Sequence, residues 1–279
     1  MINIYRKSLL YKTGVEYGDY TINHIEGCAH GCNYPCYAML MAKRFGRIKT
    51  NREWLKPKLV ANSLELLEQE IPRLKSKIKS VHMCFMSDPF MLGYPEIHRM
   101  SLEIIGLLNA HGIMVTTLTK GVYPDDLLDF GSNPDNEYGV SLVSIDPQYQ
   151  RVFEPYSARW FQRIRSLERL QKQGAKTWVS MEPYPTPNIV KQDIMQILEK
   201  LAFVDKIIFG KLNYNVNSSK YRENKEFYNR LSDIVIEFCQ KRGILYHIKR
   251  GTFTPEINHT YCPQIRLPMP ARAARSGGF

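Results

Sequence analysis

The segment GCAHGCNYPCY, residues 27–37, brings Cys28, Cys32 and Cys36 within nine positions of one another. It directly follows a β-rich run, Tyr20–Glu26, so the thiols are expected in the loop after a first strand. Three neighbouring thiolates suit one iron–sulfur cluster, and three ligands on a four-iron cluster leave one iron without a protein ligand. The segment therefore predicts a cluster whose open iron can bind a small molecule.

Beyond this loop, strand-like runs alternate with helical ones. Apolar residues recur with helical spacing over Pro95–Ala110, Ala158–Gln173, Ile189–Leu201 and Glu223–Lys241. Strands are expected at Tyr20–Glu26, Val81–Met86, Met114–Thr119, Val140–Ile145, Thr177–Met181 and Lys206–Lys211, with a possible seventh at Ile244–Lys249. Gly112, Gly174 and Gly243 fall where three of the helices should end.

This repeated order is typical of parallel strands joined by crossover helices. A chain of 279 residues is long enough for one such domain. The expected fold is α/β, a partial (β/α)6-type TIM barrel with parallel strands and the cluster at the C-terminal face of the strands. We expect a single domain over residues 1–267 with a short N-terminal extension, and a loose basic tail over residues 268–279.

Composition limits the setting in which the chain works. The first 14 residues, MINIYRKSLLYKTG, contain neither a continuous apolar stretch nor a small-residue cleavage site, so no signal or targeting peptide is expected. No apolar run approaches the roughly 18 residues of a membrane span. The expected location is the cytoplasm, without a membrane partner. There, cysteines serve metal sites or buried thiols more often than disulfides, and Cys84, Cys239 and Cys262 are expected to be small apolar fillers.

A three-cysteine loop after the first strand of a βα barrel resembles the radical S-adenosylmethionine (SAM) superfamily, whose usual spacing is C-x3-C-x2-C. Here Pro35 lengthens the second interval to C-x3-C-x3-C. Further segments resemble the spore photoproduct lyase branch of that superfamily. They are Met86-Ser87-Asp88-Pro89, Leu118-Thr119-Lys120, Val143-Ser144-Ile145 and Glu154-Pro155.

The resemblance implies a [4Fe–4S] cluster on Cys28, Cys32 and Cys36, with S-adenosylmethionine bound at the open iron. It also implies a set of residues that bind this cofactor: Ser87, Lys120 and Ser144 at its methionine moiety, with Lys120 pairing the carboxylate, Asp88 as a further cofactor-binding residue, and Tyr34 or Tyr37 facing its adenine. Which of the two tyrosines takes that place is left open, because Pro35 alters the loop.

Three more residues are candidates for catalysis. Glu182 and Tyr184 end the fifth expected strand on the catalytic face, and Glu182 is also a candidate to bind the cofactor ribose or the substrate. Spore photoproduct lyases carry a hydrogen-donating cysteine two residues before the serine of the serine-aspartate turn. That place is Phe85 here, and Cys84 is the nearest thiol.

By resemblance, the reduced cluster cleaves S-adenosylmethionine to a 5′-deoxyadenosyl radical that abstracts hydrogen from a substrate. The net charge of +11 favours polyanions, so a nucleic acid or nucleotide is the leading substrate, in repair or modification. A reducing electron donor such as a flavodoxin or ferredoxin is expected. The alternatives are a radical SAM enzyme acting on a small molecule or peptide, and a non-catalytic nucleic-acid-binding protein stabilised by zinc, with His30 or a distant thiol as fourth ligand.

Overall fold

Eight strands form the larger sheet of the computed structural model, which describes residues 1–254. In chain order they are β2 (Leu10–Lys12), β3 (Tyr20–Ile22), β6 (Ser80–Met83), β7 (Met114–Thr119), β8 (Glu137–Ser141), β9 (Lys176–Tyr184), β10 (Lys206–Lys211) and β11 (Leu245–Ile248). Their spatial order is β11-β10-β9-β8-β7-β6-β3-β2. Every pair from β3 to β11 is parallel, whereas β2 runs antiparallel to β3. The expected α/β fold, a partial TIM barrel with parallel strands, is confirmed, and β11 is the seventh parallel strand.

The barrel is open on one side, because within residues 1–254 no pairing joins its edge strands β2 and β11. The loop between β2 and β3 bridges this opening. The carboxylate of Glu16 in that loop lies 3.0 Å from Nε2 of His247 on β11 and accepts from the backbone N–H of Arg250 at 3.3 Å. A loop contact therefore takes the place of strand pairing at this edge.

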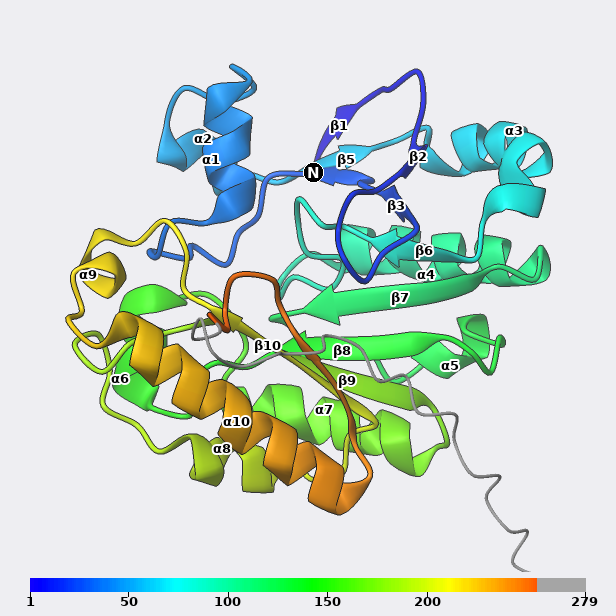
Figure 1. Cartoon of the computed structure of the whole chain (residues 1–279). Coiled ribbons are helices and arrows are strands. Elements are labelled where there is room, and N and C mark those ends of the chain that lie inside the picture. Colours follow the sequence, from blue (N-terminus) through cyan, green and yellow to red (C-terminus); the bar gives the residue numbers. More distant parts are fainter. Residues whose placement is uncertain (255–279) are drawn as a thin grey trace, which may run out of the picture.

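A second, smaller sheet supports the N-terminal part of the chain. It contains β1 (Ile2–Ile4), β5 (Lys58–Val60) and β4 (Ile25–Glu26) in that spatial order. β1 is parallel and β4 antiparallel to β5. This sheet lies beside the start of the cysteine segment, with the first two helices nearby (Figure 1).

Helices occupy most of the connections between strands. They are α1 (Tyr37–Arg44), α2 (Asn51–Trp54), α3 (Ser63–Leu74), α4 (Pro95–Ala110), α5 (Leu127–Phe130), α6 (Pro147–Phe153), α7 (Trp160–Lys172), α8 (Ile194–Lys200), α9 (Val216–Ser219) and α10 (Asn224–Arg242), with a 3₁₀ turn at Lys75–Lys77. Gly112, Gly174 and Gly243 all have positive φ just after a helix, as expected. α4, α7 and α10 contact the strands that they connect and cover the outer face of the sheet (Figure 1).

Several expected boundaries were wrong. The run Tyr20–Glu26 is split, because the chain leaves β3 after Ile22 and pairs again as β4 in the smaller sheet. β6 ends at Met83, since Cys84 adopts a left-handed φ of 65°. The strand expected at Val140–Ile145 is β8, Glu137–Ser141. Its first residues include a glutamate and a glycine, which are uncommon in strands, so its start was placed too late. α8 begins only at Ile194, where the side chain of Asp193 caps it.

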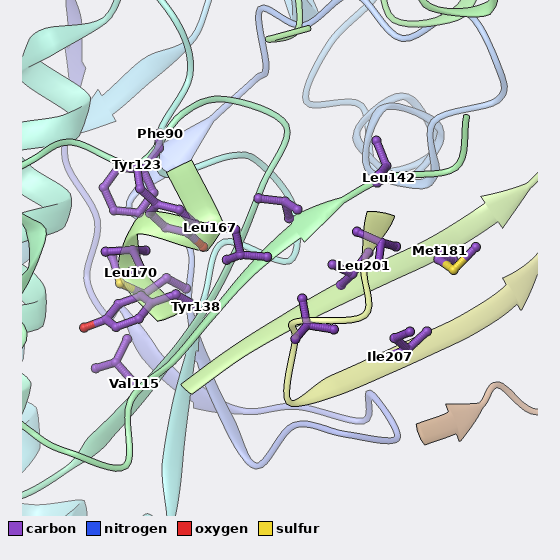
Figure 2. Packing of buried hydrophobic residues seen from close by; sticks show 14 of the residues in the cluster. Phe90, Val115, Tyr123, Tyr138, Leu142, Leu167, Leu170, Met181, Leu201 and Ile207 are labelled. Atoms are coloured by element: carbon purple, nitrogen blue, oxygen red, sulfur yellow. The ribbon is translucent and has the colours of Figure 1, made fainter. Parts of the chain in front are cut away.

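The main hydrophobic core lies between the large sheet and its helices. Figure 2 shows part of it, with Leu167 and Leu170 of α7 beside the rings of Phe90, Tyr123 and Tyr138. These five side chains are at most 1% exposed. The apolar face of α7 recurs every three or four residues, which is why this segment forms a helix that packs on the sheet.

The expected tail, residues 268–279, and Cys262 lie outside the residues that the structure describes. Among residues 1–254, no helix is both long enough and apolar enough to cross a membrane.

Replacement of Leu167 by alanine should lower the free energy of unfolding by about 2–4 kcal/mol, because it leaves a cavity in a core that cannot collapse fully. Leu92, which lies in a turn and is 40% exposed, is the matched control, and Leu92→Ala should cost about 0.5 kcal/mol or less. Urea denaturation followed by circular dichroism measures both. Equal losses for the two variants would contradict this placement of the core.

Candidate active site

The cysteine segment is held against its neighbours by close backbone contacts. Gly27 has a φ of 93°, and a Cβ there would lie 2.7 Å from the carbonyl oxygen of Trp54. The next residue, Cys28, donates its N–H to that same carbonyl at 2.9 Å. Gly31 has a φ of 65°, and a Cβ there would lie 2.7 Å from the ring of Tyr156. Only glycine fits both positions.

The middle of the segment docks on the end of α6. Asn33 donates its backbone N–H to Phe153 at 2.9 Å and its side-chain amide to Val152 at 2.7 Å. Tyr156 donates its N–H to the carbonyl of His30 at 3.2 Å. Residues far apart in the sequence therefore fix the loop that carries the thiols.

Asp88 joins this loop to the ends of β6 and β7. Its carboxylate lies 2.8 Å from Nε2 of His30 and accepts hydrogen bonds from the Thr119 hydroxyl and the Lys120 N–H, both at 2.7 Å, and from the Phe90 N–H at 2.9 Å. Burial opposes ionisation, but the charge of His30 and these hydrogen bonds outweigh it and lower the pKa of Asp88 to about 2. Each of its two oxygens already has two polar protein neighbours, so Asp88 is suited to positioning the loop.

The three thiols form a donor set that suits a cluster. Cys28, Cys32 and Cys36 are all free and half-buried. Burial, with the charges of Asp88 and Cys32, holds the pKa of the Cys28 thiol well above its usual range. Burial also raises the pKa of Cys32 to about 12, and the charge of Cys36 adds to this effect. Burial thus disfavours the free thiolates, and coordination to a cationic iron group would stabilise their charged form.

The described residues fit a cluster better than a zinc ion. Within residues 1–254, no three His, Cys, Asp or Glu side chains are arranged to hold one metal ion. A four-iron cluster places each thiolate on a different iron and needs no such convergence, whereas structural zinc needs four ligands on one ion. His30, considered as the fourth zinc ligand, is buried with its Nε2 against Asp88.

Lys120, at the end of β7, lies beside the thiols in a buried group of charges. Its Nζ is 3.8 Å from Oε1 of Glu154, whose other oxygen is 2.6 Å from Nη2 of Arg163. Burial works against the charged ammonium, but the charges of Glu154 and Cys32 raise the pKa of Lys120. Two cations thus share one carboxylate, which leaves an excess positive charge next to the cysteine loop.

The two tyrosines of the loop have different surroundings. Tyr34 is 5% exposed, donates its hydroxyl to Glu154 at 3.3 Å, and has its ring centroid 5.7 Å from Nζ of Lys120. Tyr37 is 53% exposed at the first position of α1. Tyr34 is therefore part of the buried charge group, and Tyr37 is the ring that stays free to face a ligand.

The two expected serine ligands already make local contacts. The hydroxyl of Ser87 donates to the carbonyl of Gly27, which joins the turn after β6 to the start of the cysteine loop. The Ser144 oxygen accepts the N–H of Asp146 at 3.1 Å. Both oxygens keep a lone pair for a ligand, so both remain candidates.

Glu182 lies near the end of β9, where its Oε2 is 2.9 Å from Nζ of Lys249. Burial raises the pKa of Glu182, against the opposing charge of Lys249. Tyr17, in the loop that bridges the open side of the barrel, lies close by, with Nζ of Lys249 5.8 Å from its ring centroid. The charge of Glu182 also contributes to a raised pKa of Tyr17, after burial.

Aromatic rings surround Tyr17. Its ring centroid is 6.0 Å from that of Phe85 and 6.1 Å from that of Trp178. Phe85 in turn stacks on His82 at 3.9 Å. Burial lowers the pKa of His82 to about 3, so this ring is neutral. These four rings, with the adjacent Glu182–Lys249 ion pair, form what we call the Tyr17 cluster.

Two of the expected catalytic residues are buried in apolar surroundings. Tyr184 is 1% exposed in the hydrophobic core beside Phe209, because β9 shifts register against β10 before it ends and the alternation of faces is broken. Cys84 is 4% exposed, with its Sγ 3.3 Å from Nδ1 of His24. Its left-handed backbone turns the thiol into a small apolar cluster, as expected for a filler.

Sequence reasoning did not assign Arg163 or Tyr17. The sequence pattern could have identified Arg163, because it lies on the apolar face of α7, one turn before Leu167, and a charged residue there requires a buried partner. No sequence pattern identifies Tyr17, because its neighbours come from strands that are distant in sequence. Glu154 was singled out only as part of a short resemblance.

Two uncharacterized proteins are similar to the chain in sequence. ORF301 of Acidianus two-tailed virus is 25% identical over 199 residues, which are 67% of this chain and 64% of that protein. MJ0683 of Methanocaldococcus jannaschii is 23% identical over 258 residues, covering 88% of this chain and 95% of that protein. The chain thus spans less than two thirds of the viral relative.

Solved structures share the fold. A spore photoproduct lyase complexed with dinucleoside spore photoproduct superposes with a TM-score of 0.68 at 16% identity, over 88% of this chain and 80% of that one. Streptococcus suis SuiB bound to S-adenosylmethionine gives a TM-score of 0.54 at 14% identity, over 82% of this chain and 46% of that one.

The sequence profile of the Radical SAM superfamily matches residues 22–201, which include the cysteine loop and the strands from β6 to β9. This superfamily uses a [4Fe–4S] cluster and S-adenosylmethionine, the two cofactors that the cysteine loop predicts. Because the match covers more than half of its length, the chain belongs to the radical SAM superfamily.

Proposed function

We propose that this radical SAM enzyme abstracts hydrogen from a nucleotide unit of a nucleic acid. The observation that carries the proposal is the basic character of the strand ends that form the site. β7 is followed by Lys120, β10 ends at Lys211, and β11 is followed by Lys249 and Arg250. A site with several cations at its strand ends suits a substrate that carries phosphates, and the similar lyase structure holds a dinucleoside.

Cys28, Cys32 and Cys36 would hold the cluster, and Lys120 would hold the carboxylate of S-adenosylmethionine. When bound, the two groups supply a 5′-deoxyadenosyl radical. Lys120 suits its role because its ammonium makes no hydrogen bond to any of residues 1–254 and has only the shared Glu154 as counter-ion, at 3.8 Å. A ligand carboxylate balances the excess charge and accepts the free N–H donors.

The reacting part of the substrate would lie against the Tyr17 cluster. Aromatic rings offer stacking surfaces, which a nucleobase uses well. The Glu182–Lys249 pair offers an acceptor and a donor to base or sugar groups.

Modification fits this site better than cysteine-dependent repair. Phe85 stands where spore photoproduct lyases have their hydrogen-donating cysteine, and its ring packs in the Tyr17 cluster. The neighbouring Cys84 is buried in a separate apolar cluster. The residue at the donor position therefore has no thiol hydrogen to return.

Deuterated oligonucleotides test the substrate class. The anaerobically reconstituted enzyme, reduced with dithionite, should release 5′-deoxyadenosine that carries deuterium from the oligonucleotide, as measured by mass spectrometry. Cys32→Ala should abolish the product, whereas Cys239→Ala, which changes a buried thiol on α10, should retain it. Transfer from peptides or small molecules but never from oligonucleotides would refute the nucleic-acid substrate. Bound zinc without any product would refute the radical enzyme.

Lys120→Gln should weaken S-adenosylmethionine binding about tenfold or more, because it removes a charge-assisted hydrogen bond worth roughly 1.5–3 kcal/mol. Equilibrium dialysis of labelled S-adenosylmethionine with the reconstituted protein measures the effect. Lys172→Gln, an exposed position on α7, is the control and should bind normally. Unchanged binding in Lys120→Gln would remove Lys120 from the cofactor site.

Asp88→Asn should destabilise the fold by about 2–3 kcal/mol and reduce cluster loading, because an amide cannot accept all four hydrogen bonds. Asp146→Asn is the control, since asparagine also caps a helix well. Asp88 has a folded-state pKa of about 2, below its usual 3.8. Its stabilising effect is therefore present above about pH 4 and is lost as the pH falls towards 2. Urea denaturation and iron content measure both effects, and a variant that unfolds and loads like wild type would contradict the role.

A further inference from the structure

Two segments away from the Tyr17 cluster combine exposed aromatic rings with basic side chains. In the N-terminal segment, residues 5–12, Tyr5 is 75% and Tyr11 43% exposed, and Arg6, Lys7 and Lys12 lie between or beside them. In the segment at the end of α1, residues 43–49, Phe45 is 65% exposed among Lys43, Arg44, Arg47 and Lys49. Large exposed rings cost solvation and often mark a binding surface.

A cavity of about 450 Å³ joins the two segments. Arg6 and Tyr11 line it from the N-terminal side, and Arg47 and Trp54 line it from the side of α1 and α2. Its volume falls in the range of roughly 300–1,000 Å³ found for ligand pockets. Residues that are distant in sequence thus build one site of suitable size.

The cavity lies next to the cysteine loop. Met86, which also lines it, follows β6 directly before the serine-aspartate turn. Trp54 belongs to a small apolar cluster against which Cys28, Cys36 and Met86 pack. A ligand in the cavity is therefore a near neighbour of the cluster site.

The charge of the cavity is positive. Glu26 is the one acidic residue that lines it, and its carboxylate lies 3.5 Å from Arg6 and 3.0 Å from Lys58. Arg6 also donates to the Asn23 carbonyl at 2.8 Å, so this guanidinium is fixed in place. The guanidinium of Arg47 has no ion pair or hydrogen bond with any residue of 1–254 and is free to bind an anion.

We infer that this surface, the cavity with residues 5–12 and 43–49, binds a single-stranded stretch of nucleic acid beside the reacting nucleotide. The inference rests on the proposed function. Arg47 would contact a phosphate, Phe45 and Tyr11 would stack on unpaired bases, and the cavity would take one base or phosphate. Interleaved rings and cations are the means by which proteins hold single strands, because every base has a face for stacking.

A basic surface near a cluster would also suit an acidic electron-donor protein. Such a partner would account for the lysines and arginines through their charge alone. It does not explain three exposed rings placed among them or a cavity with a free guanidinium, so the single strand is favoured.

Fluorescence anisotropy with a labelled single-stranded oligonucleotide tests the inference on the reconstituted full chain. Arg47→Gln should weaken binding about fivefold and lower the salt dependence, the slope of log K against log salt, by about 0.7. Phe45→Ala, which changes no charge, should weaken binding about five- to tenfold and leave that slope unchanged. Arg99→Gln, on α4 and already paired with Glu103, is the matched control and should bind normally. Circular dichroism and iron content verify that each variant is folded and loaded.

The outcomes separate this surface from the proposed function. If the enzyme takes deuterium from oligonucleotides, but both Arg47→Gln and Phe45→Ala bind the oligonucleotide with wild-type affinity, the binding surface is overturned and the proposed function is kept. No binding or transfer by the wild-type enzyme would overturn both. Slower reduction of the Arg47→Gln cluster by a flavodoxin, with unchanged oligonucleotide binding, would overturn the inference in favour of an acidic redox partner.

Discussion

The buried carboxylate of Asp88 is the contact on which the geometry of the site depends. It follows β6, accepts a hydrogen bond from the end of β7, and faces His30 inside the cysteine loop. One charged group with four partners therefore ties the cysteine loop to the strand ends, in addition to the backbone contacts that dock the loop on α6 and Trp54. Such a group is stable in a buried place only when all of its bonds are made. The loop and the strand ends thus form a single unit, and the longer interval around Pro35 is accommodated without loss of this contact.

The same unit places charge where the cofactors require it. Glu154 lies at the end of α6, in the segment on which the cysteine loop docks, and it balances only part of the charge of Lys120 and Arg163. A buried excess of positive charge costs free energy in the absence of a counter-ion. A thiolate-bound cluster and a carboxylate ligand both supply negative charge, so the folded chain is prepared for the groups that its family uses.

The sequence was sufficient for features that depend on local order. Alternating strands and helices predicted the parallel sheet, and the spacing of Cys28, Cys32 and Cys36 predicted the cluster loop. It failed where side-chain direction depends on backbone detail: the left-handed residue after β6 turns Cys84 away, and a register shift buries Tyr184. It was silent on Tyr17, whose neighbours are known only once the barrel has formed.

The closure of the open side explains where a long substrate can enter. The loop between β2 and β3 spans the gap, with Glu16 bonded to His247 and Tyr17 among the inner rings. If the substrate is a polymer, as proposed, entry through that side would break these contacts, so the C-terminal ends of the strands are the expected approach. Arg47 and the exposed Phe45 lie in the turn after α1, the helix that directly follows the cysteine loop. The loop that completes the barrel would then block the lateral route, while the basic surface near the cluster would be open to the same polymer.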